Sequence, residues 1–349
     1  MRFSRSNEDR SQRTARTPDP MNQYIVGVDL GGTNIVVATV AQDGSAIHGL
    51  LSEPTPVADG PDAVVDHISW MIQGSIERAR AELNGHLELA GVGIGAPGPL
   101  DTRRGIVRLA PNLGWHDMPL RDRVENAVNL NATLDNDANC ATLGEAWLGA
   151  ARESSIVVGI TIGTGIGGGV VIDGQLFHGA SDVAGEIGHT TIDSTGRRCK
   201  CGNYGCLEAY ASGPAIARRA VEGIESGSPS HLPDYVQGNL SFITAQTVYQ
   251  AAHEGDEFAL ELIQETARFL GTGIANIINI LNPDVVVVCG GVTLAGDRLF
   301  IPLRREVTRR AFKPAVEACR IVPGALPGTA GVFGAVAAFK HQKASRGKS

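Results

Sequence analysis

The sequence is poor in aromatic residues, in cysteine and in long hydrophobic segments. Phe, Trp and Tyr make up 5% of the 349 residues, and only six residues are cysteine. No apolar run reaches the roughly 18 residues that a membrane-spanning helix needs, so we expect no membrane partner. So few cysteines, together with the absence of a secretory signal pattern, argue against a disulfide framework and predict a cytoplasmic protein.

An excess of basic residues is also lacking. The chain has 30 Lys and Arg against 37 Asp and Glu, which gives a net charge of −7. Because a nucleic-acid surface needs a concentrated basic face, we expect no nucleic-acid partner. Small anions are still possible ligands, since backbone amides bind them without net positive charge. Glycine, by contrast, is abundant, with 44 residues.

Three of the cysteines lie close together and close to a histidine. Cys199 and Cys201 are two positions apart, Cys206 follows five later, and His189 precedes the first by ten. Three thiolates and one imidazole complete a tetrahedral Zn²⁺ shell, the arrangement of structural sites. Disulfides, unliganded core thiols and a core histidine are the alternatives, but the polar residues 197–203 favour a ligand loop.

Two glutamates flank the outermost ligands of this predicted zinc loop. Glu186 lies three positions before His189, and Glu208 lies two positions after Cys206. A metal ion that holds the loop together would bring both carboxylates to one place. This is the first sign of a functional site.

Residues 24–40 and 156–172 each predict a strand, a glycine-rich turn and a second strand. The two segments are 132 residues apart in equivalent positions, which predicts a duplicated α/β domain. If the two turns face each other, they could hold a polyphosphate, with Asp29 near its counterion. An ordinary glycine-rich hairpin is the alternative.

Gly163-x-Gly165-x-x-Gly168 also matches a dinucleotide fingerprint, but a strand follows where that motif requires a helix, so we reject an NAD oxidoreductase.

The remaining pattern alternates helices and strands. We expect disorder in residues 1–20 and a loop over residues 224–240. Strands are predicted at 90–94, 130–134 and 285–289, and helices at 61–83, 138–150, 215–223, 244–252, 257–281 and 328–340. The small residues of the last helix predict close packing on another element.

Asp135-Asn136-Asp137 ends the strand at 130–134 and leads into a helix. An aspartate at a helix start is most simply a capping residue. The alternative is a general base, because such a carboxylate needs only to be ionised, close to its substrate and aligned.

Four motifs together resemble the ROK family of sugar kinases, over about residues 22–342. They are Asp29-x-Gly31-Gly32-Thr33-Asn34, Asn136-Asp137, Gly185-Glu186-Ile187-Gly188-His189 and Cys199-x-Cys201-Gly202-x-x-Gly205-Cys206-x-Glu208. Within the family the sequence is most similar to bacterial glucokinases. The resemblance implies a duplicated actin-like (ribonuclease H-like) ATPase fold of class α/β, with two domains and a cleft between them.

The resemblance also implies residue roles. Asp137 would be the general base, and the sugar would be bound by Gly98, Asn112, Asn136, Glu186, His189 and Glu208. ATP would be held by Gly31, Gly32, Thr33, Asn34, Thr164 and Gly165 at the phosphates and by Gly290 and Gly291 at the adenosine, with Mg²⁺ near Asp29.

The implied domains are a smaller one at 21–135, completed by a helix at about 328–342, and a larger one at 136–327 that carries the zinc loop.

The implied activity is ATP-dependent phosphorylation of a hexose 6-hydroxyl, most simply that of glucose. N-acetylmannosamine, N-acetylglucosamine, mannose and fructose are alternative substrates, and polyphosphate is an open alternative to ATP. A sugar-responsive transcriptional regulator is the alternative of another class, which we disfavour because only about 20 residues precede the first hairpin. Family members are commonly dimers or tetramers, so we expect a homo-oligomer.

Overall fold

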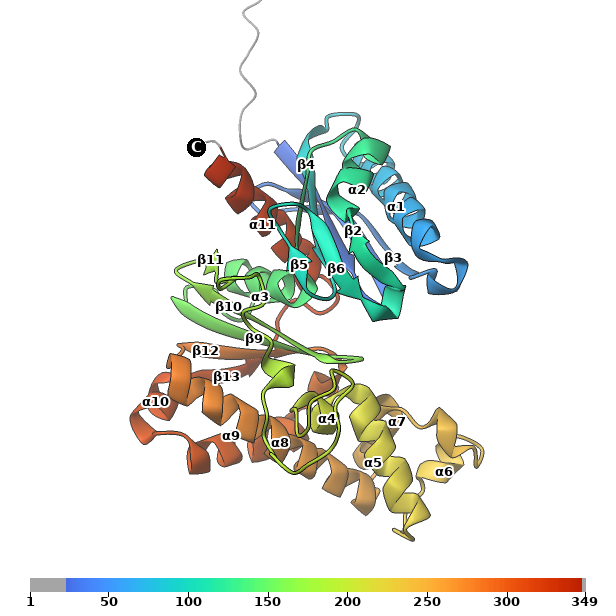
Figure 1. Ribbon diagram of the computed structural model, residues 1–349, viewed down its shortest axis with the longest axis vertical. Coiled ribbons are helices and arrows are strands. Elements are labelled where there is room, and N and C mark those ends of the chain that lie inside the picture. The colour runs from blue at the N-terminus through green and yellow to red at the C-terminus, as the bar shows by residue number, and fades with distance from the viewer. Residues whose placement is uncertain (1–22, 347–349) are drawn as a thin grey trace, which may run out of the picture.

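The computed structural model describes residues 23–346, so the expectation for residues 1–20 lies outside the described part of the chain. Its first sheet has five strands in the order β3-β2-β1-β4-β8 (Figure 1). The three N-terminal strands are antiparallel, and β4 and β8 join them in parallel. The strands are β1 (Gln23–Leu30), β2 (Asn34–Ala41), β3 (Ile47–Pro54), β4 (Glu88–Ala96) and β8 (Ala132–Asn136).

The second sheet repeats this topology. Its order is β11-β10-β9-β12-β13, again with three antiparallel strands followed by two parallel ones. The strands are β9 (Ile156–Ile162), β10 (Ile166–Ile172), β11 (Gln175–Leu176), β12 (Val285–Cys289) and β13 (Arg320–Pro323). The predicted duplication is therefore confirmed at the level of the whole sheet.

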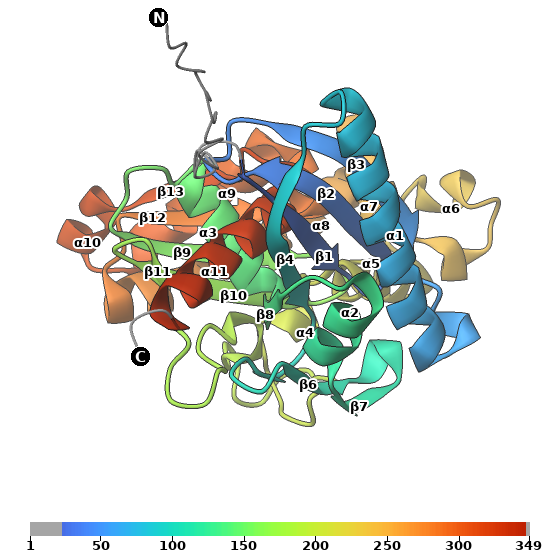
Figure 2. The ribbon, with the colours of Figure 1, turned by 90° about the horizontal axis from the view of Figure 1, so that it is seen from above.

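Two helices lie side by side between the sheets (Figures 1 and 2). They are α3 (Asp137–Trp147), which packs on β9 and β10, and α11 (Ala330–Arg346), which packs on β1 and β4. An added Cβ at Gly334 of α11 would overlap the carbonyl oxygen of Cys140 in α3. The close packing expected from the small residues of the last helix is therefore confirmed.

The outer face of each sheet has its own helices and its own core. On the first sheet lie α1 (Pro61–Glu82) and α2 (Leu120–Val128). The second sheet is covered mainly by α8 (Glu257–Leu281) and α9 (Asp297–Arg310), whose buried side chains pack against β9 and β12. Smaller helices complete this half: α4 (Glu208–Ala211), α5 (Gly213–Glu225), α6 (Leu232–Tyr235), α7 (Ala245–His253) and α10 (Lys313–Ala318).

A third, small sheet follows β4. It consists of β5 (Leu100–Asp101), β6 (Ile106–Ala110) and β7 (Trp115–Met118), in that order. The sequence pattern did not predict these strands. No helix in the described residues is long and apolar enough to cross a membrane.

Two local expectations are wrong. Residues 224–240 are not all loop, because buried Leu232 anchors the short helix α6. The strand expected at 130–134 is β8, which begins two residues later and runs through Asp135 and Asn136. The reason is that Asn129 adopts a left-handed conformation (φ 54°) at the end of α2, and Asp135 is buried and continues the strand.

Candidate functional site

Two carboxylates lie at the ends of β1 and β8, the two strands on either side of β4 in the first sheet. Asp29 is near the end of β1 and Asp137 is the first residue of α3, and Gly95 of β4 lies between them. Both are partly exposed. Burial raises the pKa of Asp137 to about 6, and the charge of Glu186 adds to this. Burial, followed by the charge of Asp137, raises the pKa of Asp29 to about 7.

Asn136, and not Asp137, is the N-cap of α3. Its Oδ1 accepts hydrogen bonds from the amides of Ala138 (2.9 Å) and Asn139 (3.1 Å). The same side chain donates from Nδ2 to the carbonyl oxygen of Gly98 at 3.4 Å. Asp137 Oδ1 also accepts a hydrogen bond from the Ala138 amide, at 2.8 Å. The capping prediction for Asp137 is therefore right in part: both side chains bind a free amide at the helix start, and Asn136 holds the N-cap position.

The four predicted metal ligands converge. Candidate ligand atoms of His189, Cys199, Cys201 and Cys206 all lie within 4.8 Å of one another. The Cys201 and Cys206 sulfurs are 3.7 Å apart, and Cys199 Sγ is 3.8 Å from His189 Nδ1. All six cysteines are free thiols, so the disulfide alternative does not hold. The donor set and its spacing suit a tetrahedral Zn²⁺ site.

The two flanking glutamates lie beside this cluster. Glu208 accepts a hydrogen bond from the Ile166 amide at 2.9 Å, and its other oxygen is 3.7 Å from Cys199 Sγ. Glu186 lies 4.0 Å from Nε2 of His189. One ring nitrogen of His189 thus faces the cysteines, while the other faces Glu186. The charge of Glu186 also raises the pKa of Asp137.

The predicted nucleotide residues lie in three exposed turns. Gly31 to Asn34 close the β1–β2 hairpin, and Gly163 to Gly165 close the β9–β10 hairpin. Gly290 and Gly291 follow β12, which pairs in parallel with β9. Gly290 has φ 96° and lies against the carbonyl oxygen of Ile162, where a side chain would collide. The second hairpin and the turn at Gly290 therefore share one edge of the second sheet.

The other sugar-side candidates lie on the first half of the chain. Asn112 is exposed and follows β6, and the position where Gly32 would carry a Cβ is 3.5 Å from its side chain. Gly98 has φ 90° and lies against the carbonyl oxygen of Leu109, so that no side chain fits there. Gly98 thus precedes β5, and Asn112 lies between β6 and β7 of the small sheet.

Sequence reasoning did not assign two groups of polar residues near this site. Buried Glu145 of α3 accepts hydrogen bonds from the amides of Ala325 and Leu326, just before α11. Asp135 pairs with His178, and Asp182 binds Thr102. These partners are 43 or more residues apart in sequence, and no local pattern indicated that they would meet.

The sequence and the fold are similar to those of known proteins. The sequence model of the ROK family matches residues 25–342. The chain is 38% identical to a glucokinase of Halalkalibacterium halodurans, with 94% of this chain and 98% of the relative covered. It is 34% identical to a putative xylose repressor of a Caldicellulosiruptor species, with coverage of 90% and 77%.

The structure is similar to the crystal structure of a ROK family glucokinase from Streptomyces griseus in complex with glucose and AMPPNP. The TM-score is 0.76 at 34% identity, and 90% of this chain and 98% of that chain are covered. Together with the duplicated sheets, this assigns the actin-like ATPase fold and confirms the expected fold class.

Proposed function

The chain belongs to the ROK family, and we propose that it transfers the γ-phosphoryl group of ATP to the 6-hydroxyl of a hexose, with glucose as the preferred substrate. The supporting relatives are glucokinases that this chain spans almost completely. The observation that carries the proposal is the position of Asp137, a partly exposed carboxylate with a raised pKa at the start of α3, near Glu186.

Asp137 is the proposed general base. With a pKa of about 6, its side chain is ionised in about ten protein molecules for every one in which it is protonated at pH 7. It takes the proton from the sugar 6-hydroxyl, whose oxygen attacks the γ-phosphorus as the bond to the ADP oxygen breaks. A base with a pKa near the working pH is both ionised and able to accept a proton, which general-base catalysis requires.

The sugar lies, in this proposal, between residues from both halves of the chain. Asn136, Glu186, His189 and Glu208 bind its hydroxyl groups on one side. Gly98 and Asn112 close the other side, where the backbone of Gly98 lies against the carbonyl oxygen of Leu109. Asn136 links the two groups, since it caps α3 and donates a hydrogen bond to Gly98.

Zn²⁺ is proposed to be held by His189, Cys199, Cys201 and Cys206, whose donor set suits it. When bound, the ion cross-links the loop and takes no part in phosphoryl transfer. The protein residues do the rest: His189 presents Nε2 toward Glu186 and the sugar, while its other nitrogen faces the cysteines. A fixed imidazole orientation would give the sugar hydroxyls a rigid partner.

The three glycine-rich turns are proposed to bind ATP. Gly31, Gly32, Thr33 and Asn34 face the phosphates from the first sheet, Thr164 and Gly165 from the second, and Gly290 and Gly291 contact the adenosine. Mg²⁺ carried by the nucleotide would lie near Asp29. The pKa of Asp29, about 7 in the protein alone, would be lowered by a nearby cation, so the carboxylate would be ionised in the complex.

We further propose that the domain boundary lies near residue 135, with the helix at about 328–342 completing the first domain. The packing of α11 on β1 and β4 supports this division.

The free thiols are consistent with a protein that works in the cytoplasm, and a dimer or tetramer is the proposed assembly. Sugar regulation of transcription is the second candidate, because a repressor is among the relatives.

A panel of sugars in a coupled ADP assay with ATP tests the proposal. Glucose should give the highest kcat/KM, ahead of mannose, fructose, N-acetylglucosamine and N-acetylmannosamine. Sugar binding in calorimetry without turnover of any sugar would overturn the kinase proposal and favour the regulator. Turnover of another sugar in preference to glucose would overturn only the substrate assignment.

A further inference from the structure

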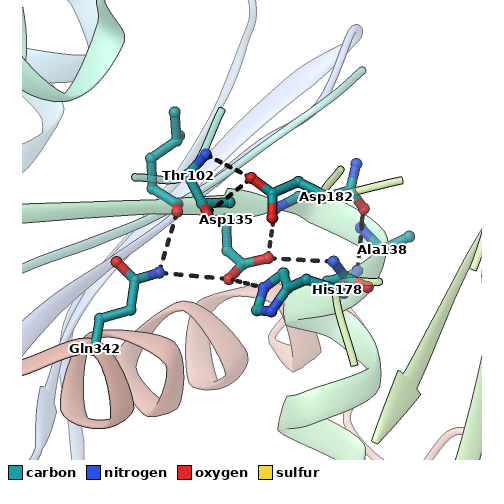
Figure 3. Close-up of polar contacts among 9 residues, drawn as sticks. Thr102, Asp135, Ala138, His178, Asp182 and Gln342 are labelled. Atoms are coloured by element: carbon teal, nitrogen blue, oxygen red, sulfur yellow. Dashed lines mark hydrogen bonds and ion pairs between the residues drawn. The ribbon is translucent and has the colours of Figure 1, made fainter. Parts of the chain in front are cut away.

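Four polar residues close to the proposed sugar site join the two halves of the chain (Figure 3). Asp135 belongs to β8 and Thr102 to the turn between β5 and β6, both in the first half. His178 and Asp182 lie in the loop that follows β11, in the second half. We call these four residues the clasp. None of them has a role in the function proposed above.

Asp135 is the buried end of the clasp. Its side chain is 1% exposed, and its Oδ2 is 2.8 Å from Nε2 of His178. Its other oxygen accepts hydrogen bonds from the Asn136 amide (2.9 Å) and from Nδ2 of Asn139 (3.2 Å). Gln342 of α11 lies 3.5 Å from Oδ2. Because a buried carboxylate needs such partners, His178 is held firmly against β8.

Asp182 is the other end of the clasp. Its Oδ2 accepts two hydrogen bonds from Thr102, one from the backbone amide and one from the hydroxyl, each 3.0 Å long. Asp182 has φ 59°, a left-handed conformation that few residues other than glycine adopt, though aspartate tolerates it. The backbone of the loop is therefore held in a restricted conformation at the point where it contacts the small sheet.

The imidazole of His178 interacts with both carboxylates of the clasp and, when protonated, offsets one of their two negative charges. His178 bonds to Asp135 and is near Asp182, and both carboxylates favour its protonated form, which raises its pKa. The side chain is 29% exposed, so the bond to Asp135 is partly shielded from water. A charged hydrogen bond in such a place is stronger than a surface ion pair.

Three of the clasp residues are near proposed sugar contacts in the sequence. Thr102 is four residues after Gly98, and Asp182 is four residues before Glu186. Asp135 precedes Asn136 directly. We propose that the clasp fixes the loop of Glu186 against the wall formed by Gly98, and that His178, Asp182 and Thr102 are positioning residues for sugar binding. This inference rests on the proposed function.

The test measures glucose affinity by calorimetry and steady-state kinetics in the full chain with Thr102→Val, Asp182→Asn and His178→Phe. Thr102→Val removes one hydrogen bond with little change of shape, and it is the variant most certain to fold. We expect the glucose Kd and KM to rise about tenfold in each variant, the typical effect of losing a hydrogen bond to a charged group. The KM for ATP should change less than about twofold, because the nucleotide turns lie elsewhere.

A purely structural role would not produce this split between the two substrates. His178→Gln keeps a donor toward Asp135 and should restore a large part of the glucose affinity lost in His178→Phe. The double variant Thr102→Val with Asp182→Asn should have a glucose Kd no higher than that of the weaker-binding single variant, since both substitutions disrupt the same contact.

Thr308→Val and Asp234→Asn, exposed residues on α9 and α6, are the matched controls and should behave like the unaltered protein. An unaltered glucose Kd in Thr102→Val and His178→Phe would overturn the clasp, and so would an equal rise in both KM values. Failure of the proposed function is recognised separately, because the unaltered protein would then not phosphorylate glucose in the same assays.

Discussion

Replacement of Asp137 by asparagine separates catalysis from stability. The change keeps the shape of the side chain and removes its ability to accept a proton. General-base catalysis typically contributes a factor of about 10² to 10⁴ to the rate, so kcat should fall by that amount. The glucose Kd should stay within about threefold, because the residues proposed to hold the sugar are otherwise intact.

The same substitution should not destabilise the protein at neutral pH. Burial raises the pKa of Asp137 from 3.8 to about 6, so the folded state binds this proton more tightly than the unfolded state does. The contribution of this proton to the free energy of unfolding is complete below about pH 4 and is lost as the pH rises through about 6. At pH 7 the ionised carboxylate therefore costs up to about 3 kcal/mol, and about 1 to 2 kcal/mol after allowance for its partial exposure. Asparagine avoids this cost.

The assay combines a coupled ADP measurement with thermal or urea unfolding at pH 7 and at pH 4. The variant should be inactive and at least as stable as the unaltered protein at pH 7, and its advantage should disappear at pH 4. Asp234→Asn, on the exposed surface of α6, is the matched control and should change neither quantity. An Asp137→Asn protein that keeps near-normal turnover would refute the general-base assignment. A loss of stability at pH 7 would refute the electrostatic reasoning.

Three further predictions concern pH, the metal loop and helix packing. The kcat/KM for glucose should fall as the pH drops below about 6, because Asp137 of the free enzyme then gains a proton, and a flat profile of kcat/KM from pH 5 to 8 would contradict this. Cys201→Ser should lower the zinc content measured by elemental analysis and raise the glucose KM about tenfold, and an unaltered zinc content would show that Cys201 is not a ligand. Gly334→Ala should destabilise the protein by about 1 to 3 kcal/mol in urea unfolding, because the new methyl group meets the Cys140 carbonyl. Gly74→Ala in α1, where the new Cβ would meet a side chain at 3.4 Å, is its control and should leave stability equal or higher.

Features set by local sequence could be predicted well. The bounds of α8 and β12 agree with the sequence prediction, because the period of apolar residues and the flanking turn residues specify them. The four residues that converge as a candidate metal site were predicted from their spacing alone, and the duplication from two similar hairpins. In each of these cases the information lies within a few dozen neighbouring residues.

Features that depend on distant partners could not be predicted. The sequence pattern places Asp135 after the strand at 130–134, in the segment that leads into the helix. Asp135 is instead buried in β8, where His178, 43 residues later, supplies its hydrogen bond. The small sheet and the contact between Thr102 and Asp182 were missed for the same reason, since only the folded chain brings their parts together.

This difference bears on how the site is held together. The proposed base follows β8, whereas Glu186 comes from a loop beyond β11, so no stretch of local sequence sets the distance between them. That distance depends on contacts between the halves, among them the pair Asp135–His178 and the bond from Thr102 to Asp182. Since a misplacement of about 1 Å can cost a factor of 10² in rate, loss of these contacts should lower activity even though none of them is proposed to touch the sugar.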